Sequence, residues 1–388
     1  MRSRTRTAAL LTAAVLGLAG LTVPQATAQA TAQARASAAS PPSGPAVAVA
    51  MGDSFISGEA GRWLGNTDRY AGSRNGTDRA WTSGSAYDPA KVYGASGAVG
   101  GCHRSDVSEI AVAPLPGIEQ RINLACSGAE TVNVLSAAKG GQPYNGEAPQ
   151  TDRLAALAKT KRVKLIALSI GGNDLGFGQI IGDCAYDWYF RRLCWKKQAP
   201  VVEGKLPGVK AKVAAVVDDI RSAMRGAGYA DGDYRLVLQS YPSPLPGGES
   251  FRLSQNDSDR MFKDGCPFND RDATWAAYTL VPQIGGMVES VAVAKGTDFM
   301  DLRDALAGHE VCALGTEQVD QGGPDPREHE WFRFLDYTNT QGTLEESTHP
   351  NVHGQKAMAA CLGLVSAAAL STRCGARCPA RTARVRAA

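Results

Sequence analysis

The sequence predicts an α/β fold, a three-layer α/β/α sandwich with a mainly parallel central sheet. Short apolar runs of the kind that form buried strands alternate along the chain with longer segments of helical periodicity. Strands that alternate with helices favour a parallel sheet covered on both faces. We expect the strands at 46–51, 163–170, 234–241 and 297–302.

The helical segments have apolar residues three or four positions apart, as in Val209, Val213 and Val216. Helices are expected at 150–160, 206–226, 271–294 and 353–370. Two further stretches, 57–101 and 242–270, are rich in Gly, Ser, Asn, Asp and Pro and are predicted to be long loops. Because long loops in a compact domain are often functional, we expect them to form the walls of a binding cleft.

The beginning of the chain has the pattern of a secretory signal peptide over residues 1–28. Three arginines precede an apolar stretch that ends at Val23, and Ala26-Thr27-Ala28 matches a small-residue cleavage site. A membrane anchor is the alternative, but the apolar stretch is short for a span of ~20 residues and lacks a basic flank. After the signal peptide we expect a disordered lead-in over 29–45, one domain over 46–372 and a basic tail over 373–388.

The overall charge indicates no charged macromolecule as the main partner. The formal net charge is +3, and removal of the leader takes three arginines with it, so the exported chain is close to neutral. This balance gives no electrostatic argument for binding to nucleic acid or to an anionic surface. We therefore expect a secreted, extracellular monomer that binds no nucleic acid and contacts lipid aggregates at most transiently.

Nine cysteines in an exported chain favour disulfides over metal thiolates. No C-x-x-C pair is accompanied by a second pair at zinc spacing. Pairing between neighbours along the chain would join Cys102 with Cys126, Cys184 with Cys194, and Cys266 with Cys312. One pair and one odd thiol would remain among Cys361, Cys374 and Cys378, and spacing alone does not prove any of these connections.

Four short motifs carry side chains suited to acyl transfer. The first is Gly52-Asp53-Ser54, which directly follows an apolar strand and so places a serine where ligands of α/β proteins bind. Each motif alone is also an ordinary turn or helix cap, and only the ordered set predicts one site. The other three are Ser127-Gly128, Gly171-Gly172-Asn173-Asp174 and His349-Pro350-Asn351.

Acyl transfer needs a nucleophile, a base and donors to an oxyanion. Ser54 supplies the hydroxyl, and His349 supplies a base because the ordinary pKa of histidine lies near neutrality. Glu346, three residues before His349, is interpreted as the group that fixes the imidazole tautomer, with a local main-chain carbonyl as the alternative. The backbone N–H groups of Ser54 and Gly128 and the side-chain amide of Asn173 are the expected oxyanion donors.

The remaining histidines are not expected to act in catalysis. His353 lies four residues after His349 and could form a metal pair with it, but no third ligand is suitably spaced. We therefore expect neither a metal nor another cofactor. The other three are interpreted as surface or loop residues: His103, His309 and His329.

In this order the four motifs resemble those of the SGNH hydrolase family, also called GDSL esterases and lipases. The resemblance covers nearly all of the mature chain and implies a flavodoxin-like sandwich, with Ser54 as nucleophile, His349 as base, and Gly128 and Asn173 as oxyanion donors. The cysteine loops look like those of secreted actinobacterial members, which implies the bridges Cys102–Cys126, Cys184–Cys194 and Cys266–Cys312.

The chain departs from the family pattern at two positions. The family usually has Asp three residues before the histidine, where this chain has Glu346, and some secreted members use Glu or a main-chain carbonyl there. Phe55 follows the serine where the family usually has Leu. No Gly-x-Ser-x-Gly motif occurs anywhere, which argues against the α/β-hydrolase fold.

The resemblance implies a serine carboxylester hydrolase, an esterase, lipase or phospholipase that forms an acyl-enzyme on Ser54. The alternatives are a carbohydrate O-acetyl esterase or an acyltransferase on the same site and, from another class, a non-catalytic surface-binding module. Aromatic residues in the first long loop could stack on sugar rings, line an acyl groove or only pack the loop. They are Trp63, Tyr70, Trp81, Tyr87 and Tyr93.

Overall fold

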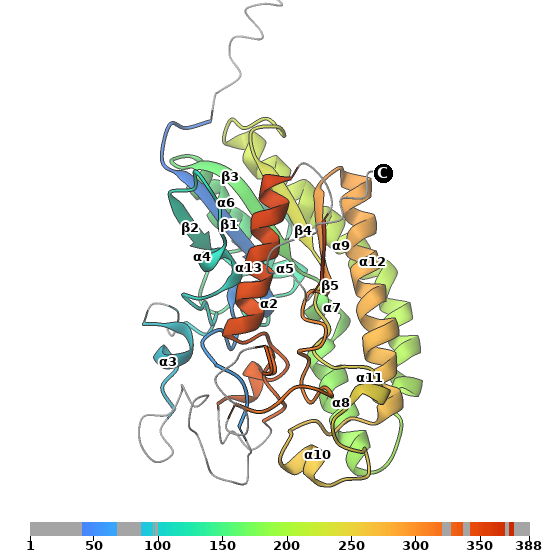
Figure 1. Ribbon diagram of the computed structural model, residues 1–388. Coiled ribbons are helices and arrows are strands. Elements are labelled where there is room, and N and C mark those ends of the chain that lie inside the picture. Colours follow the sequence, from blue (N-terminus) through green and yellow to red (C-terminus); the bar gives the residue numbers. More distant parts are fainter. Residues whose placement is uncertain are drawn as a thin grey trace, which may run out of the picture. The chain divides into compact units, whose positions relative to one another are not determined.

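Strand β1, Ala46–Gly52, lies inside one parallel sheet, and all seven of its residues are buried, so both faces of the sheet are covered here. The strand order is β2-β1-β3-β4-β5-β6, and every neighbouring pair is parallel (Figure 1). This order matches the flavodoxin-like doubly wound type. The α/β prediction is confirmed. The other strands are β2 Gln120–Asn123, β3 Arg162–Ser169, β4 Arg235–Gln239, β5 Asp298–Asp304 and β6 Thr372–Gly375.

The computed structural model describes residues 41–67, 87–95, 97, 100–319, 327–336, 342–368 and 372–375. The predicted signal peptide, most of the lead-in and the basic tail beyond residue 375 lie outside these ranges, as do Tyr70, Trp81 and Cys378. In the described part of the chain, no helix is long and apolar enough to span a bilayer.

The register of β1 and β3 brings two of the motifs together. Gly52 at the end of β1 pairs with Ser169 at the end of β3, and the N–H of Asp53 donates to the carbonyl of Ser169 at 3.0 Å. The chain therefore leaves both strands at the same edge. In a sheet of this order, the carboxyl ends of these two strands flank the point where ligands bind.

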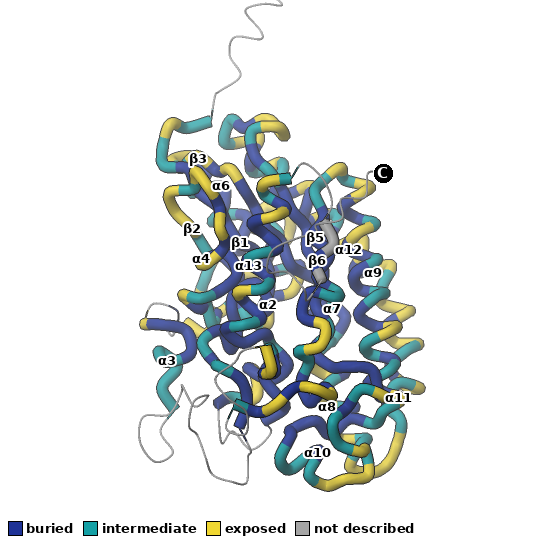
Figure 2. The backbone as a smooth tube through the Cα atoms, viewed as in Figure 1, coloured by how far each residue is buried: buried dark blue, intermediate teal, exposed yellow. Residues whose placement is uncertain are grey.

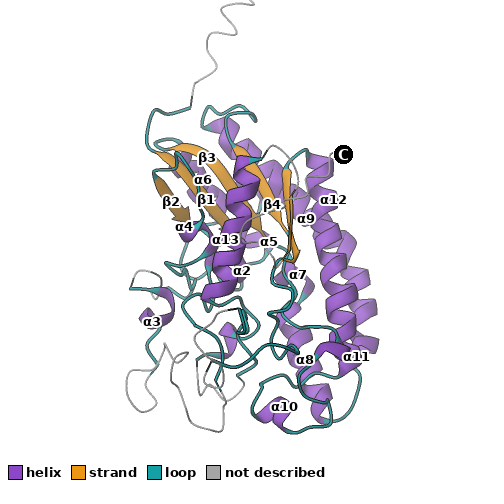
Figure 3. Ribbon diagram, in the orientation of Figure 1, coloured by secondary structure: helices purple, strands orange, loops and turns teal. Residues whose placement is uncertain are grey.

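The helices pack in two groups. Helix α9 (Trp195–Gly226) packs against both α6 (Gln150–Ala158) and α12 (Val281–Lys295). On the other side, α13 (Val352–Ala367) packs on α4 (Glu109–Val112) and lies in front of the strands in Figure 1. Figure 3 shows the strands as a single layer among the helices, and Figure 2 shows that the central strands β1, β3, β4 and β5 are mostly buried.

Helix α9 begins earlier than expected and contains Pro200 and Pro207. The apolar spacing predicted a start near residue 206, and proline in a helix interior normally breaks the helix. The longer helix begins at a side-chain cap, because the carboxylate of Asp272 accepts hydrogen bonds from the N–H groups of Cys194 and Trp195. Because Asp272 lies far along the chain from residue 194, the sequence around the helix start does not indicate this cap.

The segment predicted as one helix over 271–294 contains an irregular turn. Helix α11 (Asp270–Trp275) continues through a π-helical turn over Ala276–Leu280 into α12. Pro282 has no N–H to donate to the carbonyl four residues earlier, and π turns accommodate such an interruption.

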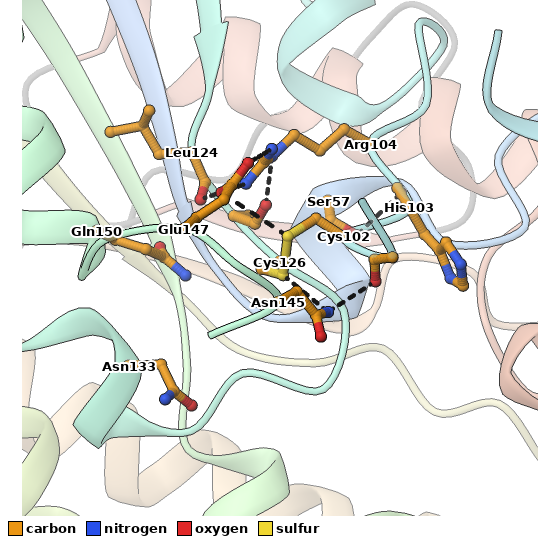
Figure 4. Close-up of a disulfide and its surroundings, with 12 residues drawn as sticks. Ser57, Cys102, His103, Arg104, Leu124, Cys126, Asn133, Asn145, Glu147 and Gln150 are labelled. Atoms are coloured by element: carbon orange, nitrogen blue, oxygen red, sulfur yellow. Dashed lines mark hydrogen bonds and ion pairs between the residues drawn. A yellow bond between two sulfur atoms is a disulfide. The ribbon is translucent and has the colours of Figure 1, made fainter. Parts of the chain in front are cut away.

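Four disulfides join segments of the described chain. The structure pairs Cys102 with Cys126, Cys184 with Cys194 and Cys266 with Cys312, which are the bridges that the resemblance implies, and it adds Cys361–Cys374. Figure 4 shows the first bridge beside Arg104. The guanidinium of Arg104 donates to the carbonyls of Leu124 and Ala125 and to the carboxylate of Glu147. These contacts hold the segment that leads to Gly128.

Candidate active site

Ser54 begins the short helix α2 (Ser54–Ser57) directly after β1. Gly52 makes this sharp exit possible: its φ is +129°, and a Cβ atom there would lie 1.8 Å from the carbonyl oxygen of Ser169. The carboxylate of Asp53 accepts a hydrogen bond from the N–H of Phe55 at 3.2 Å and caps the turn. The backbone therefore fixes the serine at the carboxyl edge of the sheet.

A hydroxyl from another element holds Asp53 in place. Tyr241, just after β4, donates its hydroxyl hydrogen to the Asp53 carboxylate and accepts a hydrogen bond from the N–H of Gly172. Burial raises the pKa of Asp53 to about 7. These contacts join the turn that carries Ser54 to the turn after β3.

His349 contacts Ser54 directly. Its Nε2 lies 2.6 Å from the Oγ of Ser54, although the two residues are 295 positions apart in the chain. Burial lowers the pKa of His349, whereas the negative charge of Glu59 opposes this decrease. A neutral imidazole is the form that can accept the serine proton.

The other ring nitrogen of His349, Nδ1, is buried and has no hydrogen-bond partner among the described residues. The main-chain carbonyls of Ser347 and Glu345 raise the pKa of the ring. Of the two orienting groups considered from the sequence, only the main-chain carbonyl is among the groups that raise this pKa.

The carboxylate of Glu346, expected to orient the imidazole, is hydrogen-bonded to other side chains, and no hydrogen bond joins it to the ring in the described part of the chain. Its Oε2 accepts a hydrogen bond from Trp63 Nε1 at 2.6 Å. Its Oε1 accepts hydrogen bonds from the hydroxyls of Tyr87 and Tyr93 at 2.5 and 3.0 Å. Burial raises the pKa of Glu346 to about 7. The main-chain carbonyl of Glu346 accepts a hydrogen bond from the N–H of His349 at 3.3 Å.

Glu59 and His103 form a second buried pair that the sequence did not predict. The Nδ1 of His103 lies 2.7 Å from the Glu59 carboxylate, which also accepts a hydrogen bond from the Tyr93 hydroxyl. Burial, the largest effect, raises the pKa of Glu59, but the contacts with His103, the charge of His349 and the Tyr93 hydrogen bond together lower it. Burial is also the largest effect on His103 and lowers its pKa, but the Glu59 hydrogen bond and the charges of Glu59, Glu346 and Glu345 together raise it. The hydroxyl of Tyr93 thus bridges the carboxylates of Glu59 and Glu346.

The expected oxyanion donors come from two turns that are tied together. Gly128 has a φ of +79°, and a Cβ atom there would lie 2.4 Å from the hydroxyl of Tyr144. One N–H of the Asn173 amide donates to the carbonyl of Ala129 at 2.9 Å. Asp174 accepts hydrogen bonds from both the N–H and the hydroxyl of Thr131. An amide nitrogen has a second N–H, which leaves one donor of Asn173 for a ligand.

These groups line one cavity of about 330 Å³. Ser54, Gly128, Asn173 and His349 all contribute to its wall, whereas Glu346 does not. The volume lies within the range of small-molecule sites. The rest of the wall is largely apolar and includes Phe55, Phe177, Ile181, Leu335 and Leu344. The cavity thus places a serine, a histidine and two potential donors beside a surface suited to a hydrocarbon chain.

His353 does not join His349 at the site. Its ring packs against that of His329 at a centroid distance of 6.2 Å, and burial lowers its pKa to about 4. Within the described residues, no group of three or more His, Cys, Asp or Glu side chains is arranged to hold a metal ion.

The three described aromatic residues of the first long loop pack inside the protein. Trp63 and Tyr93 are fully buried in a small hydrophobic cluster, and Tyr87 packs against it. Their polar atoms bind the carboxylates of Glu59 and Glu346. None of the three lines the cavity.

Comparison with known proteins supports the fold. No family model matches the chain, and no curated protein matches it in sequence. The structure is similar to that of an extracellular lipase from Streptomyces rimosus, with 21% sequence identity, a TM-score of 0.51, and coverage of 83% of this chain and 97% of the lipase. A phospholipase A1 from Streptomyces albidoflavus NA297 shows 18% identity, a TM-score of 0.49, and coverage of 83% and 98%.

Proposed function

We propose that this protein is a secreted serine carboxylester hydrolase that acts through an acyl-enzyme on Ser54. The observation that carries the proposal is the 2.6 Å contact between Ser54 Oγ and His349 Nε2, at a cavity that Gly128 and Asn173 also line. A hydroxyl bonded to a buried imidazole is the arrangement that activates a serine nucleophile.

In the proposed cycle, Ser54 Oγ attacks the ester carbonyl while His349 Nε2 accepts the hydroxyl proton. His349 then donates this proton to the departing alcohol, and the acyl group stays on Ser54. Water, deprotonated by the same histidine, attacks the acyl-enzyme and releases the carboxylic acid. The N–H groups of Ser54 and Gly128 and the free N–H of Asn173 stabilise the oxyanion of each tetrahedral intermediate.

The imidazolium that forms in each step is stabilised by backbone and by distant charge. The carbonyls of Ser347 and Glu345 and the negative charge of Glu59 all favour the protonated ring. We infer a Ser-His dyad supported by main-chain carbonyls, in which the Glu346 carboxylate holds the supporting loop and does not touch the base.

The cavity wall favours an acyl ester of lipid type. Phe177, Ile181, Leu335 and Leu344 offer apolar surface beside Ser54, where a hydrocarbon chain would lose contact with water. The lipase from Streptomyces rimosus, which shares the fold, supports the same substrate class. Three of the five aromatic residues considered for sugar stacking are hydrogen-bonded to buried carboxylates, and the other two lie outside the described residues, so the described part of the chain offers no support for a carbohydrate esterase.

Export is supported by the four disulfides, because such bridges form and persist in oxidising compartments. The leader pattern of residues 1–28 gives the route, and its cleavage stays a prediction. Sequencing the N-terminus of protein recovered from the culture medium tests it.

The function is tested with p-nitrophenyl esters from acetyl to palmitoyl, a phospholipid and an acetylated xylan. We expect hydrolysis that favours chains longer than acetyl, and a loss of several orders of magnitude in Ser54→Ala. Ser366→Ala is a matched control, because this serine lies near the end of α13 and its hydroxyl bonds only the carbonyl of Gly363. Wild-type turnover in Ser54→Ala would refute the assignment of Ser54 as the nucleophile. A preference for acetylated xylan would refute lipid-type esters as the substrate class.

A further inference from the structure

Three neighbouring aromatic side chains are exposed at the end of helix α8, Phe177–Tyr189. Tyr186, Tyr189 and Phe190 are 61%, 66% and 49% exposed, which is unusual for large rings in one place. Their rings touch one another, with centroid distances of 4.8 Å between Tyr186 and Phe190 and 5.3 Å between Tyr189 and Phe190. We call these three residues the aromatic patch.

The patch is held rigidly at its base. The guanidinium carbon of Arg192 lies 4.9 Å from the centroid of the Phe190 ring and 5.5 Å from that of Tyr186. The same guanidinium forms an ion pair with Asp187. The disulfide Cys184–Cys194 closes the turn that carries all three rings. A surface that is ordered before binding loses little conformational entropy when it meets a partner.

The same face of α8 leads from the patch to the cavity. Gly178 and Gly182 line the cavity and are exposed, and a Cβ atom at either would meet open space. At 3.6 residues per turn, Gly178, Gly182 and Tyr189 lie within about 40° of one another around the helix. Tyr189 is about 10 Å further along the axis than Gly182. The cavity wall and the patch therefore face the same side of the molecule.

Exposed basic residues directly follow the patch along the chain, and one of them, Arg192, lies against its rings. Arg191, Arg192, Lys196 and Lys197 lie within seven positions and are exposed. Arg192 and Lys197 are paired with Asp187 and Asp183, whereas Arg191 and Lys196 add positive charge to the rim. Exposed tyrosines with arginine and lysine beside them are typical of side chains at a bilayer surface, where rings enter the headgroup region and cations meet phosphates.

We propose that the aromatic patch docks this protein onto an anionic phospholipid surface and so presents the cavity to ester bonds in that surface. The charge of the rim and the continuity of the patch with the cavity along α8 select this partner. The biological use of the surface rests on the proposed function. The binding itself does not, and it can be measured without turnover.

Binding is tested with the mature Ser54→Ala protein and vesicles of ether-linked phosphatidylcholine and phosphatidylglycerol, which contain no carboxylic ester to hydrolyse. We expect cosedimentation with the vesicles, and at least about tenfold weaker partitioning when Tyr186, Tyr189 and Phe190 are all changed to Ser. Arg191→Gln and Lys196→Gln should each weaken binding to anionic vesicles by about fivefold. Val293→Ser is the matched control, because Val293 is 76% exposed on a different helix, and it should bind as the parent does.

Activity separates this proposal from the proposed function. In the Ser54 background, the triple variant should hydrolyse a soluble short-chain ester at the parental rate and an ester embedded in anionic vesicles at least about fivefold more slowly. Equal vesicle binding by the parent and the triple variant would overturn the docking proposal, as would the absence of binding by the parent. A patch that instead joins two copies, detected as a dimer that the triple variant abolishes, would also overturn it. Inactivity on every soluble ester would refute the proposed function alone.

Discussion

The carboxylate of Glu346 accepts a hydrogen bond from the indole Nε1 of Trp63, which lies 283 positions away in the chain. This contact fixes the short helix Leu344–Glu346 immediately before His349. The Glu346 side chain is therefore a support for the loop that carries the base. In the proposed mechanism, the main-chain carbonyls of Ser347 and Glu345, which raise the pKa of His349, take the orienting role.

The first prediction follows from this support role. Glu346→Gln keeps an oxygen to accept from Trp63 and adds an N–H that can donate to Tyr87, so turnover should fall by about tenfold or less, ~1.4 kcal/mol of barrier. Glu346→Ala leaves the buried indole N–H unpaired and should lower the melting temperature. Steady-state kinetics and thermal unfolding of both variants measure these effects. A loss in Glu346→Gln as large as that in His349→Ala would mean that the carboxylate orients the ring during catalysis.

The pH profile should report His349. Because burial lowers its pKa, the acid limb of kcat/KM should have an apparent pKa below 6.5, with full activity at higher pH where the ring is neutral. Glu59 raises this pKa, so Glu59→Gln should move the limb to lower pH. Glu249→Gln, which changes a carboxylate at the surface, is the control and should leave the limb in place. A shift of the acid limb to higher pH in Glu59→Gln would contradict the claim that the Glu59 charge raises the pKa of His349.

The two neighbouring histidines should differ sharply. His349→Ala should lose several orders of magnitude in turnover, because it removes the base bonded to Ser54. His353→Ala should keep most of the activity, since its ring packs on His329. Assays with and without EDTA complete the test. Equal losses in both variants, together with sensitivity to EDTA, would indicate a metal site.

Stability should depend on a buried carboxyl outside the site. Glu109 is fully buried on α4, and burial raises its pKa to about 7 from 4.5. The folded state therefore binds this proton more tightly than the unfolded state, so this group destabilises the fold increasingly as pH rises from about 4.5 to about 7. Glu109→Gln removes the ionisation. The change that it causes in the free energy of unfolding should therefore be more favourable at pH 8 than at pH 4, by on the order of 3 kcal/mol. Denaturant titrations at both pH values measure the difference, and equal changes at both would contradict it.

The central strands could be predicted from the sequence because burial on both faces leaves a continuous apolar run, as in β1. Strands β2 and β6 were missed, because each has four residues at an edge of the sheet and lacks such a run. Local turn signals likewise indicated Ser54, Gly128 and Asn173, which line one cavity. The partners of Glu346 and the Glu59–His103 pair arise from contacts between distant segments, which no local pattern records.

The acyl-enzyme is the central claim, and intact-protein mass spectrometry tests it most directly. The mature protein is mixed with a fluorophosphonate or quenched during turnover of a p-nitrophenyl ester, and the modified peptide is then sequenced. We predict one covalent adduct, on Ser54, that His349→Ala forms far more slowly and Ser54→Ala does not form. An adduct on another residue, or rapid ester turnover with no adduct under either condition, would contradict the account.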